Sequence, residues 1–301
     1  MTSDGRTGLG ADGTQPGPAP GMWRRRIGRS ASTRLRSEEG VRGALIASVS
    51  TIAVVAVVAI VVLRSPNWPK VRNQFFDADR FVAAWPNVLR GFWVDVQMFA
   101  WAIVAIPILA LLLAVARSFR GPAFFPIRAL AVIFIDVMRG VPLILLILLL
   151  GFGVPALDLP GLPSSSFFWG ITALTLSYSA YTAEIFRSGI DSVPESQRSS
   201  ARSIGLTQWQ TLRFAILPQA MRNVVPAFMN TVVSLQKDVA LVSVLGVREA
   251  VREAQIIASR TFNYTAYVVA TVLFLAFSIP LVRFVDWYTA RDRARRGHVS
   301  V

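Results

Sequence analysis

The chain alternates between long apolar stretches and shorter polar segments. A helix that crosses the hydrocarbon core of a bilayer needs about 20 mainly apolar residues. Six stretches reach this length: Gly43–Leu63, Val96–Ala116, Ile127–Phe152, Phe167–Ile190, Asn223–Val247 and Phe262–Tyr288. The segment Trp85–Asp95 leads into the second stretch. The pattern therefore predicts an all-α membrane protein with about six transmembrane helices.

The composition supports this prediction. Of the 301 residues, 53% are hydrophobic and 16% are charged, and the mean hydropathy is +0.51. These values are too apolar for an ordinary soluble domain of this size. The net charge of +14 is compatible with nucleic-acid binding, but the arginines flank apolar spans and form no basic face with interleaved aromatic residues. We therefore expect no nucleic-acid partner.

The chain lacks the common ligands for metal ions. It contains no cysteine and a single histidine, His298, near its C-terminal end. Disulfides, thiolate chemistry and imidazole metal clusters are therefore excluded. We expect no metal site and no cofactor on this chain.

The distribution of Lys and Arg predicts the orientation of the spans. If both termini are cytoplasmic, the inner segments carry 20 of these residues and the outer segments carry eight. Residues 1–40 are rich in Gly, Ser, Pro and Arg and are predicted to form a disordered basic cytoplasmic tail. Residues 291–301 are predicted to form a basic cytoplasmic tail. The stretch 43–63 follows the arginine run Arg24–Arg26 but ends without a small-x-small cleavage site, so we interpret it as an uncleaved anchor helix.

A polar segment between the fourth and fifth spans, Ser192–Pro218, is here called the elbow. Its pattern predicts two short helices that meet at a glycine. Ser192 and Glu195 have the spacing of a capping box at the start of the first helix, and Pro194 is tolerated in its first turn. Gly205 is placed where a left-handed residue ends this helix.

The second elbow helix is also predicted from its caps. Thr207 and Gln210 repeat the capping-box spacing, and the helix is expected to end near Leu217–Pro218. One apolar stripe follows spacings of three and four: Trp209, Leu212 and Ile216. The first helix carries small residues, among them Ala201, that permit close approach of another surface. An amphipathic helix on the bilayer interface is the alternative, but the double caps and the glycine favour a rigid docking element.

Charged residues lie within the predicted spans in three pairs: Asp136 and Arg139, Glu184 and Arg187, and Lys237 and Asp238. A charge at bilayer depth costs about 3 kcal/mol, so it is expected to be paired or functional. One interpretation is a set of structural salt bridges that fix helix register. The other is a translocation pathway, in which a cation meets a substrate carboxylate and an anion meets its ammonium or a gate partner.

Other polar residues and prolines in the spans add to this picture. Tyr178 and Tyr181 place hydroxyl groups on the face that carries Glu184, although packing with a polar tip explains them equally well. Asp95 is interpreted as an interfacial carboxylate in water. Four prolines lie inside spans: Pro107, Pro142, Pro226 and Pro280. Gly140–Pro142, next to Arg139, is the strongest candidate for a broken helix that lines a cavity. Bundle packing explains the other three prolines.

The elbow resembles the EAA loop of ATP-binding cassette (ABC) importer permeases. That motif is Glu-Ala-Ala, three residues, Gly, nine residues, Ile, one residue and Leu-Pro. Here it falls on Ser199–Ala201, Gly205, Ala215 and Leu217–Pro218, and the spacing from Gly to Leu-Pro matches. The Glu, the first Ala and the Ile of the motif are replaced by Ser199, Ser200 and Ala215.

Three further segments resemble the polar amino-acid branch of this family. Met138–Ile144 is similar to its Arg-Gly-Thr-Pro-Leu segment, with Val141 in place of Thr. Ser177–Gly189 is similar to its Ser-Ala-Tyr-x-Ala-Glu-x-x-Arg-Gly stretch. Lys237–Ser243 is similar to its Lys-Asp-Thr-Ser-Leu-Val-Ser segment. The resemblance covers about residues 85–290, which implies a five-helix permease domain with the helix 43–63 as an N-terminal addition.

The resemblance implies roles for particular residues. In this family the elbow is the coupling helix that inserts into a cleft of a cytoplasmic ATPase. The residues expected to couple to the ATPase are Pro194, Glu195, Ala201, Gly205, Trp209, Leu212, Leu217 and Pro218. The residues expected along the translocation pathway are Asp136, Arg139, Tyr178, Tyr181, Glu184, Lys237 and Asp238.

The expected function is that of a non-catalytic permease subunit in a bacterial inner-membrane importer for polar amino acids, with glutamate or glutamine as first candidates. No Gly-x-x-x-x-Gly-Lys-Ser/Thr phosphate loop occurs in the chain, so ATP and Mg²⁺ are expected on a partner ATPase dimer. The other expected partners are an extracytoplasmic binding protein, a second permease subunit, identical or different, and membrane lipid. The alternative is an ion-coupled secondary amino-acid transporter, but the two related halves that it should have are not visible in the sequence.

Overall fold

The computed structural model describes residue 43 and the ranges 45–119 and 121–297. The predicted tail 1–40 and the last residues of the predicted tail 291–301 lie outside the described residues. The chain divides into two units, Met1–Trp68 and Pro69–Val301. In the first unit, Leu45–Leu63 forms the predicted N-terminal helix, and its apolar side chains are exposed. This exposure is what a span surrounded by lipid requires.

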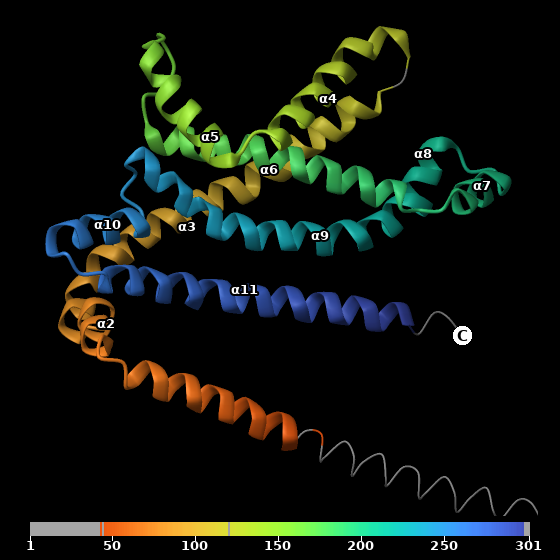
Figure 1. Ribbon diagram of the computed structural model, residues 1–301. Coiled ribbons are helices and arrows are strands. Elements are labelled where there is room, and N and C mark those ends of the chain that lie inside the picture. The colour runs from red at the N-terminus through yellow and green to blue at the C-terminus, as the bar shows by residue number, and fades with distance from the viewer. Residues whose placement is uncertain (1–42, 44, 120, 298–301) are drawn as a thin grey trace, which may run out of the picture. The chain divides into compact units, whose positions relative to one another are not determined.

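The second unit is a bundle of helices, and no strand is present in the described part of the chain. Its α-helices are α2 (Trp68–Phe75), α3 (Ala78–Ser118), α4 (Phe125–Gly140), α5 (Leu143–Leu148), α6 (Ser166–Asp191), α7 (Glu195–Ser203), α8 (Gln208–Gln210), α9 (Leu217–Asp238), α10 (Ala250–Thr261) and α11 (Thr265–Gly297). Short 3-10 helices cover Pro122–Phe124, Pro155–Leu157 and Val239–Leu245, and π-helical turns cover Leu149–Gly153 and Thr211–Ile216. Helices α7 and α8 lie at the same end of the bundle as the C-terminal end of α11, and α10 lies at the other end (Figure 1).

Helices α3 and α6 form the centre of the bundle. They pack against each other, α9 packs on α6, and α11 packs on α3 and α9. The largest core cluster joins α3, α5, α6, α9 and the 3-10 helix that follows, through residues such as Met98, Ile147, Leu174, Leu235 and Val242. A second cluster joins α3 with α10 and α11. This arrangement leaves one face of α6 free to line a cavity together with α9.

Most of the predicted spans are present as helices. Within the described residues, four helices are long and apolar enough to cross a membrane, and a bent helix pair raises the number to five if it is one span. Helix α6 is not among these candidates. At 26 residues it is about 39 Å long, but Ser, Thr, Tyr and Gly occupy many of its positions and lower its hydropathy. It tolerates them because 11 of its residues are buried inside the protein, where neighbouring helices replace lipid.

The third predicted span is broken at the expected place. Helix α4 ends at Gly140, α5 begins at Leu143, and the two halves of the span are bent by 107° (Figure 1). Val141 adopts an extended conformation (φ −85°, ψ 129°), as expected for a residue before proline. The Pro142 carbonyl then accepts hydrogen bonds from the Leu145 and Leu146 amides and starts the next helix. The other three prolines lie inside continuous helices.

The prediction that Asp95 is an interfacial carboxylate in water is wrong. Asp95 is only 2% exposed, and its Oδ2 accepts a hydrogen bond of 3.1 Å from the Ala250 amide. Helix α3 does not begin near the membrane surface at this point but extends over 41 residues. It packs against α10 there because Gly91 has no side chain to separate the two backbones.

Candidate functional site

A cavity of about 850 Å³ lies between α6 and α9 and is closed at one side by the junction of α4 and α5. Its lining includes Ser177, Tyr178, Tyr181, Glu184 and Arg187 from α6, Asn223, Asn230, Thr231, Ser234 and Asp238 from α9, and Arg139 and Leu143 from the junction. The lining reaches Ser192, so the cavity extends from the middle of α6 to the start of the elbow. The two arginines and two carboxylates in the lining balance in charge.

Five of the seven predicted pathway residues line this cavity: Arg139, Tyr178, Tyr181, Glu184 and Asp238. Asp136 and Lys237 are exposed and lie outside its lining. Asp136 shares a face of α4 with Arg139, but within the described residues the structure records no ion pair between them. Arg139 instead contacts a different helix, because its position in the last turn of α4 lets the side chain extend beyond that helix.

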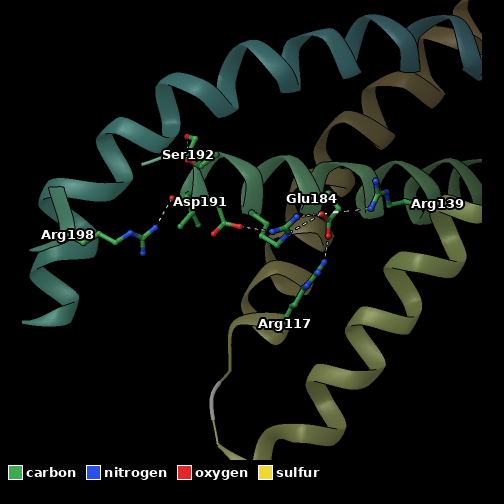
Figure 2. Close-up of polar contacts among 9 residues, drawn as sticks. Arg117, Arg139, Glu184, Asp191, Ser192 and Arg198 are labelled. Atoms are coloured by element: carbon green, nitrogen blue, oxygen red, sulfur yellow. Dashed lines mark hydrogen bonds and ion pairs between the residues drawn. The ribbon is translucent and has the colours of Figure 1, made fainter. Parts of the chain in front are cut away.

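Glu184 is the centre of an ion-pair cluster (Figure 2). Its Oε1 accepts a hydrogen bond from Arg117 Nη1 at the end of α3. Its Oε2 lies 3.0 Å from Arg187 Nη2 and 3.9 Å from Arg139 Nη1. Arg187 also contacts Asp191, with 2.6 Å between Nη1 and Oδ2. The cluster therefore joins α3, α4 and α6.

Arg117 and Asp191 were not predicted as site residues, although both carry a recognisable signal in the sequence. Arg117 is the basic residue in the last turn of α3, where a cation interacts favourably with the helix dipole. Asp191 lies four residues after Arg187, a spacing that brings side chains together on a helix. Neither signal indicates that Arg117 would meet Glu184, which is 67 residues away.

Arg139 is also held by an aromatic neighbour. Its guanidinium carbon lies 5.8 Å from the ring centroid of Tyr181, within the range of a cation–π contact. The Tyr181 hydroxyl donates a hydrogen bond of 3.2 Å to the Arg139 carbonyl oxygen. These contacts fix the end of α4 against α6, directly before the break at Pro142.

Tyr178 and Asp238 form a second polar contact in the cavity. The Tyr178 hydroxyl donates a hydrogen bond of 2.6 Å to Asp238 Oδ2 and links α6 to the end of α9. Tyr178 is buried, and its ring belongs to the main core cluster, which agrees with the interpretation of packing with a polar tip, while the residue also lines the cavity together with Glu184. Asp238, a charge within a predicted span, therefore has a hydrogen-bond partner on another helix.

The polar face of α9 was missed by the sequence analysis. Asn230, Thr231 and Ser234 line the cavity together with Asn223 and Asp238. Their spacings place them on one side of a helix. Five polar residues on one face of an otherwise apolar span are the signal that would have identified them.

The elbow has the predicted left-handed glycine at the end of its first helix and the predicted capping box at the start of its second. Gly205 has φ +88°, and the Leu206 and Gly205 amides donate to the Ala201 and Arg202 carbonyls, which is a Schellman motif. The Thr207 amide donates to the Gln210 side chain at 2.9 Å, and the Gln210 amide donates back to Thr207 at 3.3 Å. This capping box is as predicted.

The predicted capping box at Ser192 is wrong. Ser192 instead follows the last residue of α6 as its C-cap, and its hydroxyl donates to the Gly189 carbonyl oxygen and accepts from Asn223 Nδ2 at 2.8 Å. Helix α7 starts three residues later, at Glu195, with Pro194 as its N-cap. The carboxylate of Glu195 is therefore in the first turn and pairs with Arg198 at 3.5 Å.

The predicted end of the second elbow helix at Leu217–Pro218 is also wrong. The helix continues without a break from Gln208 to Leu245. Pro218 is tolerated because the preceding residues, Thr211–Ile216, form π-helical turns, in which the Leu217 amide donates to the Leu212 carbonyl. In these wider turns the helix continues although Pro218 has no backbone N–H to donate.

The apolar stripe of the elbow is divided between two surfaces. Leu212 and Ile216 pack inward against Val193 and Ala220 and attach the elbow to the bundle. Ala201 is also buried. It belongs to α7, which packs against the π-helical turns Thr211–Ile216 of the elbow. The outer surface of the elbow instead presents large apolar side chains: Ile204 (78% exposed), Trp209 (64%) and Phe214 (64%).

The chain matches a family of known proteins. Residues 122–293 match the model of a family described as "Binding-protein-dependent transport system inner membrane component". The chain is 30% identical to the "Probable amino-acid ABC transporter permease protein PatM" of Vibrio harveyi, over 72% of this chain and 96% of that protein. It is 31% identical to the "Arginine transport system permease protein ArtQ" of Bacillus subtilis, over 60% of this chain and 80% of that protein.

Solved structures of ABC transporters also resemble this chain. A chain in the "Crystal structure of an amino acid ABC transporter with histidines" superposes with a TM-score of 0.65 at 30% sequence identity, and the match covers 71% of this chain and 98% of that one. An inward-facing structure of the MetNI methionine ABC transporter, at 19% identity and a TM-score of 0.52, shares the fold.

Proposed function

We propose that this chain, which belongs to the family of binding-protein-dependent transport system inner membrane components, carries a polar amino acid across the membrane by alternating access. Its family identifies it as a multi-pass inner-membrane protein and an amino-acid ABC transporter permease.

The observation that carries the proposal is the cavity with a balanced set of charges. An amino acid at neutral pH carries one carboxylate and one ammonium group. Arg139, a planar donor from α4, is suited to the carboxylate, and Asp238, from α9, is suited to the ammonium. Glu184 and Arg187 cancel each other, so a zwitterion leaves the cavity neutral.

The α9 wall supports a polar side chain on the cargo. Asn223, Asn230, Thr231 and Ser234 present amide and hydroxyl groups along the cavity, and such groups hydrogen-bond to a carboxamide or a carboxylate. Glutamine and glutamate are therefore our first candidates. One relative is named as an arginine transport permease, so arginine belongs in the same set of tests.

The elbow is proposed to couple the bundle to a separate ATPase. Ile204, Trp209 and Phe214 expose apolar side chains on an element that is fixed by a Schellman motif and a capping box. Exposed aromatic residues on a rigid support are typical of contact surfaces. ATP and Mg²⁺ would bind to the partner ATPase dimer, and closure of that dimer would draw the elbows of two permease subunits together.

The extent of the cavity lining supports a conformation in which the cavity is open to the cytoplasm. It reaches Ser192 and Asn223 at the elbow, and the elbow is cytoplasmic if the positive-inside rule holds. An extracytoplasmic binding protein would deliver cargo to the opposite end of the bundle. Movement of the helices around the cavity would then expose it alternately to the two sides.

The proposal is tested by co-expressing the chain with candidate ATPase subunits and measuring assembly and amino-acid-stimulated ATP hydrolysis. Trp209→Glu places a charge on the proposed contact surface and should abolish both. Phe262→Glu is the matched control, because Phe262 is 81% exposed and lies between α10 and α11, away from the elbow. Unchanged assembly in Trp209→Glu would contradict the docking role, and transport driven by an ion gradient without ATPase would indicate a secondary transporter.

A further inference from the structure

Three guanidinium groups from three helices meet one carboxylate in the Glu184 cluster. Arg117, Arg139 and Arg187 all contact Glu184, while Asp191 supplies a second carboxylate to Arg187 alone. The cluster therefore has more cations than anions. One of its arginines has capacity for a further anion.

Arg139 is that arginine. Its Nη1 is 3.9 Å from Glu184 Oε2, whereas Arg187 lies at hydrogen-bond distance and Arg117 donates directly. Its side chain is 42% exposed, and it lines the cavity, which Arg117 does not. Figure 2 shows Arg139 approaching Glu184 from the side opposite to Asp191. A carboxylate that enters the cavity therefore reaches Arg139 without displacing either tighter pair.

The chemistry favours exchange at Arg139. A contact of 3.9 Å is an ion pair without a hydrogen bond. A free carboxylate can instead form two parallel hydrogen bonds to a guanidinium, which are shorter and stronger. Glu184 cannot approach Arg139 in this way, because both of its oxygens are already held by Arg117 and Arg187.

We infer that Glu184 is the resting counter-ion of Arg139, and that the carboxylate of an amino-acid cargo replaces it when the cargo binds. The inference rests on the proposed function, since it assumes that the cavity receives an amino acid. Glu184 is then a positioning residue: it holds the three arginines in place and competes with the cargo. The group that contacts the cargo is Arg139.

The exchange has a structural consequence. Arg139 is in the last turn of α4, directly before the break at Val141–Pro142, so its pair with Glu184 is one of the contacts that hold the end of α4 on α6. Cargo binding removes this contact, while Arg117 and Arg187 keep Glu184 attached to α3 and α6. The same end of α6 carries Arg187 and Asp191 and receives Arg198 of the elbow, whose Nη2 donates to the Ile190 carbonyl at 2.8 Å.

The inference predicts that removal of the Glu184 charge strengthens cargo binding. If Glu184 competes with the cargo, Glu184→Gln should bind amino acids more tightly than the wild type, by roughly two- to fivefold, the size of one half-exposed ion pair. A purely structural role predicts weaker binding. The gain should be absent for agmatine and histamine, which are L-arginine and L-histidine without the carboxylate.

The experiment uses the complex of the full chain with its ATPase subunits. Binding of L-glutamine, L-arginine and L-histidine, and of agmatine and histamine, is measured for the wild type, Glu184→Gln, Arg139→Gln and the double variant. Arg139→Gln should weaken amino-acid binding, and Glu184→Gln should give no gain in that background. Asp286→Asn is the matched control, because it removes the same charge at an exposed position of α11 outside the cavity lining, and it should leave affinity unchanged.

The outcomes separate the two claims. If the wild-type complex binds none of the amino acids, the proposed function fails. If it binds them and Glu184→Gln binds them equally or more weakly, the exchange is wrong. It is equally wrong if the gain extends to agmatine and histamine, persists without Arg139, or appears in Asp286→Asn. Should Glu184→Gln not fold, Glu184→Asp retains the charge with a shorter side chain, and a smaller gain in the same direction is expected.

Discussion

At the scale of single residues, Glu249 is the most deeply buried carboxyl group outside the spans in the described part of the chain. It is 0% exposed, and it caps α10 by accepting hydrogen bonds from the Val251 and Arg252 amides at 2.8 and 2.6 Å. Burial raises the pKa of Glu249 from 4.5 to about 7, because a charged carboxylate is poorly solvated there. The folded protein therefore binds a proton at this site more tightly than the unfolded chain.

The raised pKa of Glu249 predicts a pH-dependent stability. Its contribution is fully present below the unfolded pKa of 4.5 and is lost as the pH rises toward the folded pKa of about 7. Glu249→Gln removes this titration but keeps an oxygen for the cap. We expect the difference in thermal unfolding midpoint between variant and wild type to change between pH 5 and 8, in favour of the variant at the higher pH. Glu195→Gln, at an exposed position, should show no such change, and parallel curves for Glu249→Gln would refute the assignment.

At the scale of elements, the elbow depends on the left-handed conformation of Gly205. No atom lies within 4 Å of a Cβ placed there, so Gly205→Ala meets only the backbone penalty of about 1–2 kcal/mol. We expect a modestly lower unfolding midpoint together with reduced coupling of ATP hydrolysis to cargo.

Gly161 provides the control for this prediction. It has φ +87° and equally open surroundings but lies between α5 and α6, outside the elbow. Gly161→Ala should therefore lower the midpoint by a similar amount and leave coupling intact. Equal coupling in the two variants would show that the elbow geometry does not matter for energy transfer.

The contact between α3 and α10 depends on a different property of glycine, its lack of volume. A Cβ on Gly91 would lie 2.6 Å from the carbonyl carbon of Glu249 and 2.8 Å from the Ala250 amide nitrogen. These are backbone atoms, so Gly91→Ala must push the two helices apart, at a cost of roughly 1–3 kcal/mol. We expect a clearly lower unfolding midpoint, measured in detergent against Gly153→Ala, whose Cβ would make only an ordinary contact at 3.8 Å. Equal midpoints would mean that the helices are not in close contact.

At the scale of the whole molecule, the orientation in the membrane is a prediction from charge. It places the segment after α3 in the cytoplasm and the segment before α6 outside. The chain has no cysteine, so Ser118→Cys and Ser164→Cys each introduce a single thiol at an exposed position. In intact cells, a membrane-impermeant maleimide should label the Ser164→Cys variant and not the Ser118→Cys variant. After lysis, both variants should be labelled. The reverse pattern would invert the topology.

Much of the fold could be predicted because its signals are local. Apolar stretches predicted the helices, Pro142 predicted the broken span, and Gly205 and Thr207 predicted the hinge and the second cap. The errors in the elbow have the same origin. Ser192 and Pro218 each satisfied a local rule, but a hydrogen bond to Asn223 and a set of π-helical turns decided the actual helix boundaries.

The candidate site could be predicted only in part. The charged residues Arg139, Glu184 and Asp238 were visible because a charge in an apolar span is conspicuous. Neutral polar residues such as Thr231 and Ser234 were not, because they are common in spans and become notable only where they face a cavity. Leu212 was correctly recognised as an apolar surface residue of its helix, but its partner proved to be the bundle itself.

The sequence by itself determined the helices, the spans, the break before α5 and the family, since each follows from neighbouring residues or from motifs of fixed spacing. The tertiary structure alone decided which groups meet between distant parts of the chain. Glu184 contacts Arg117, 67 residues away, and Asp95 is buried against Ala250, 155 residues away. Such contacts depend on which helix faces pack together, and that choice is made by the burial of the whole apolar surface.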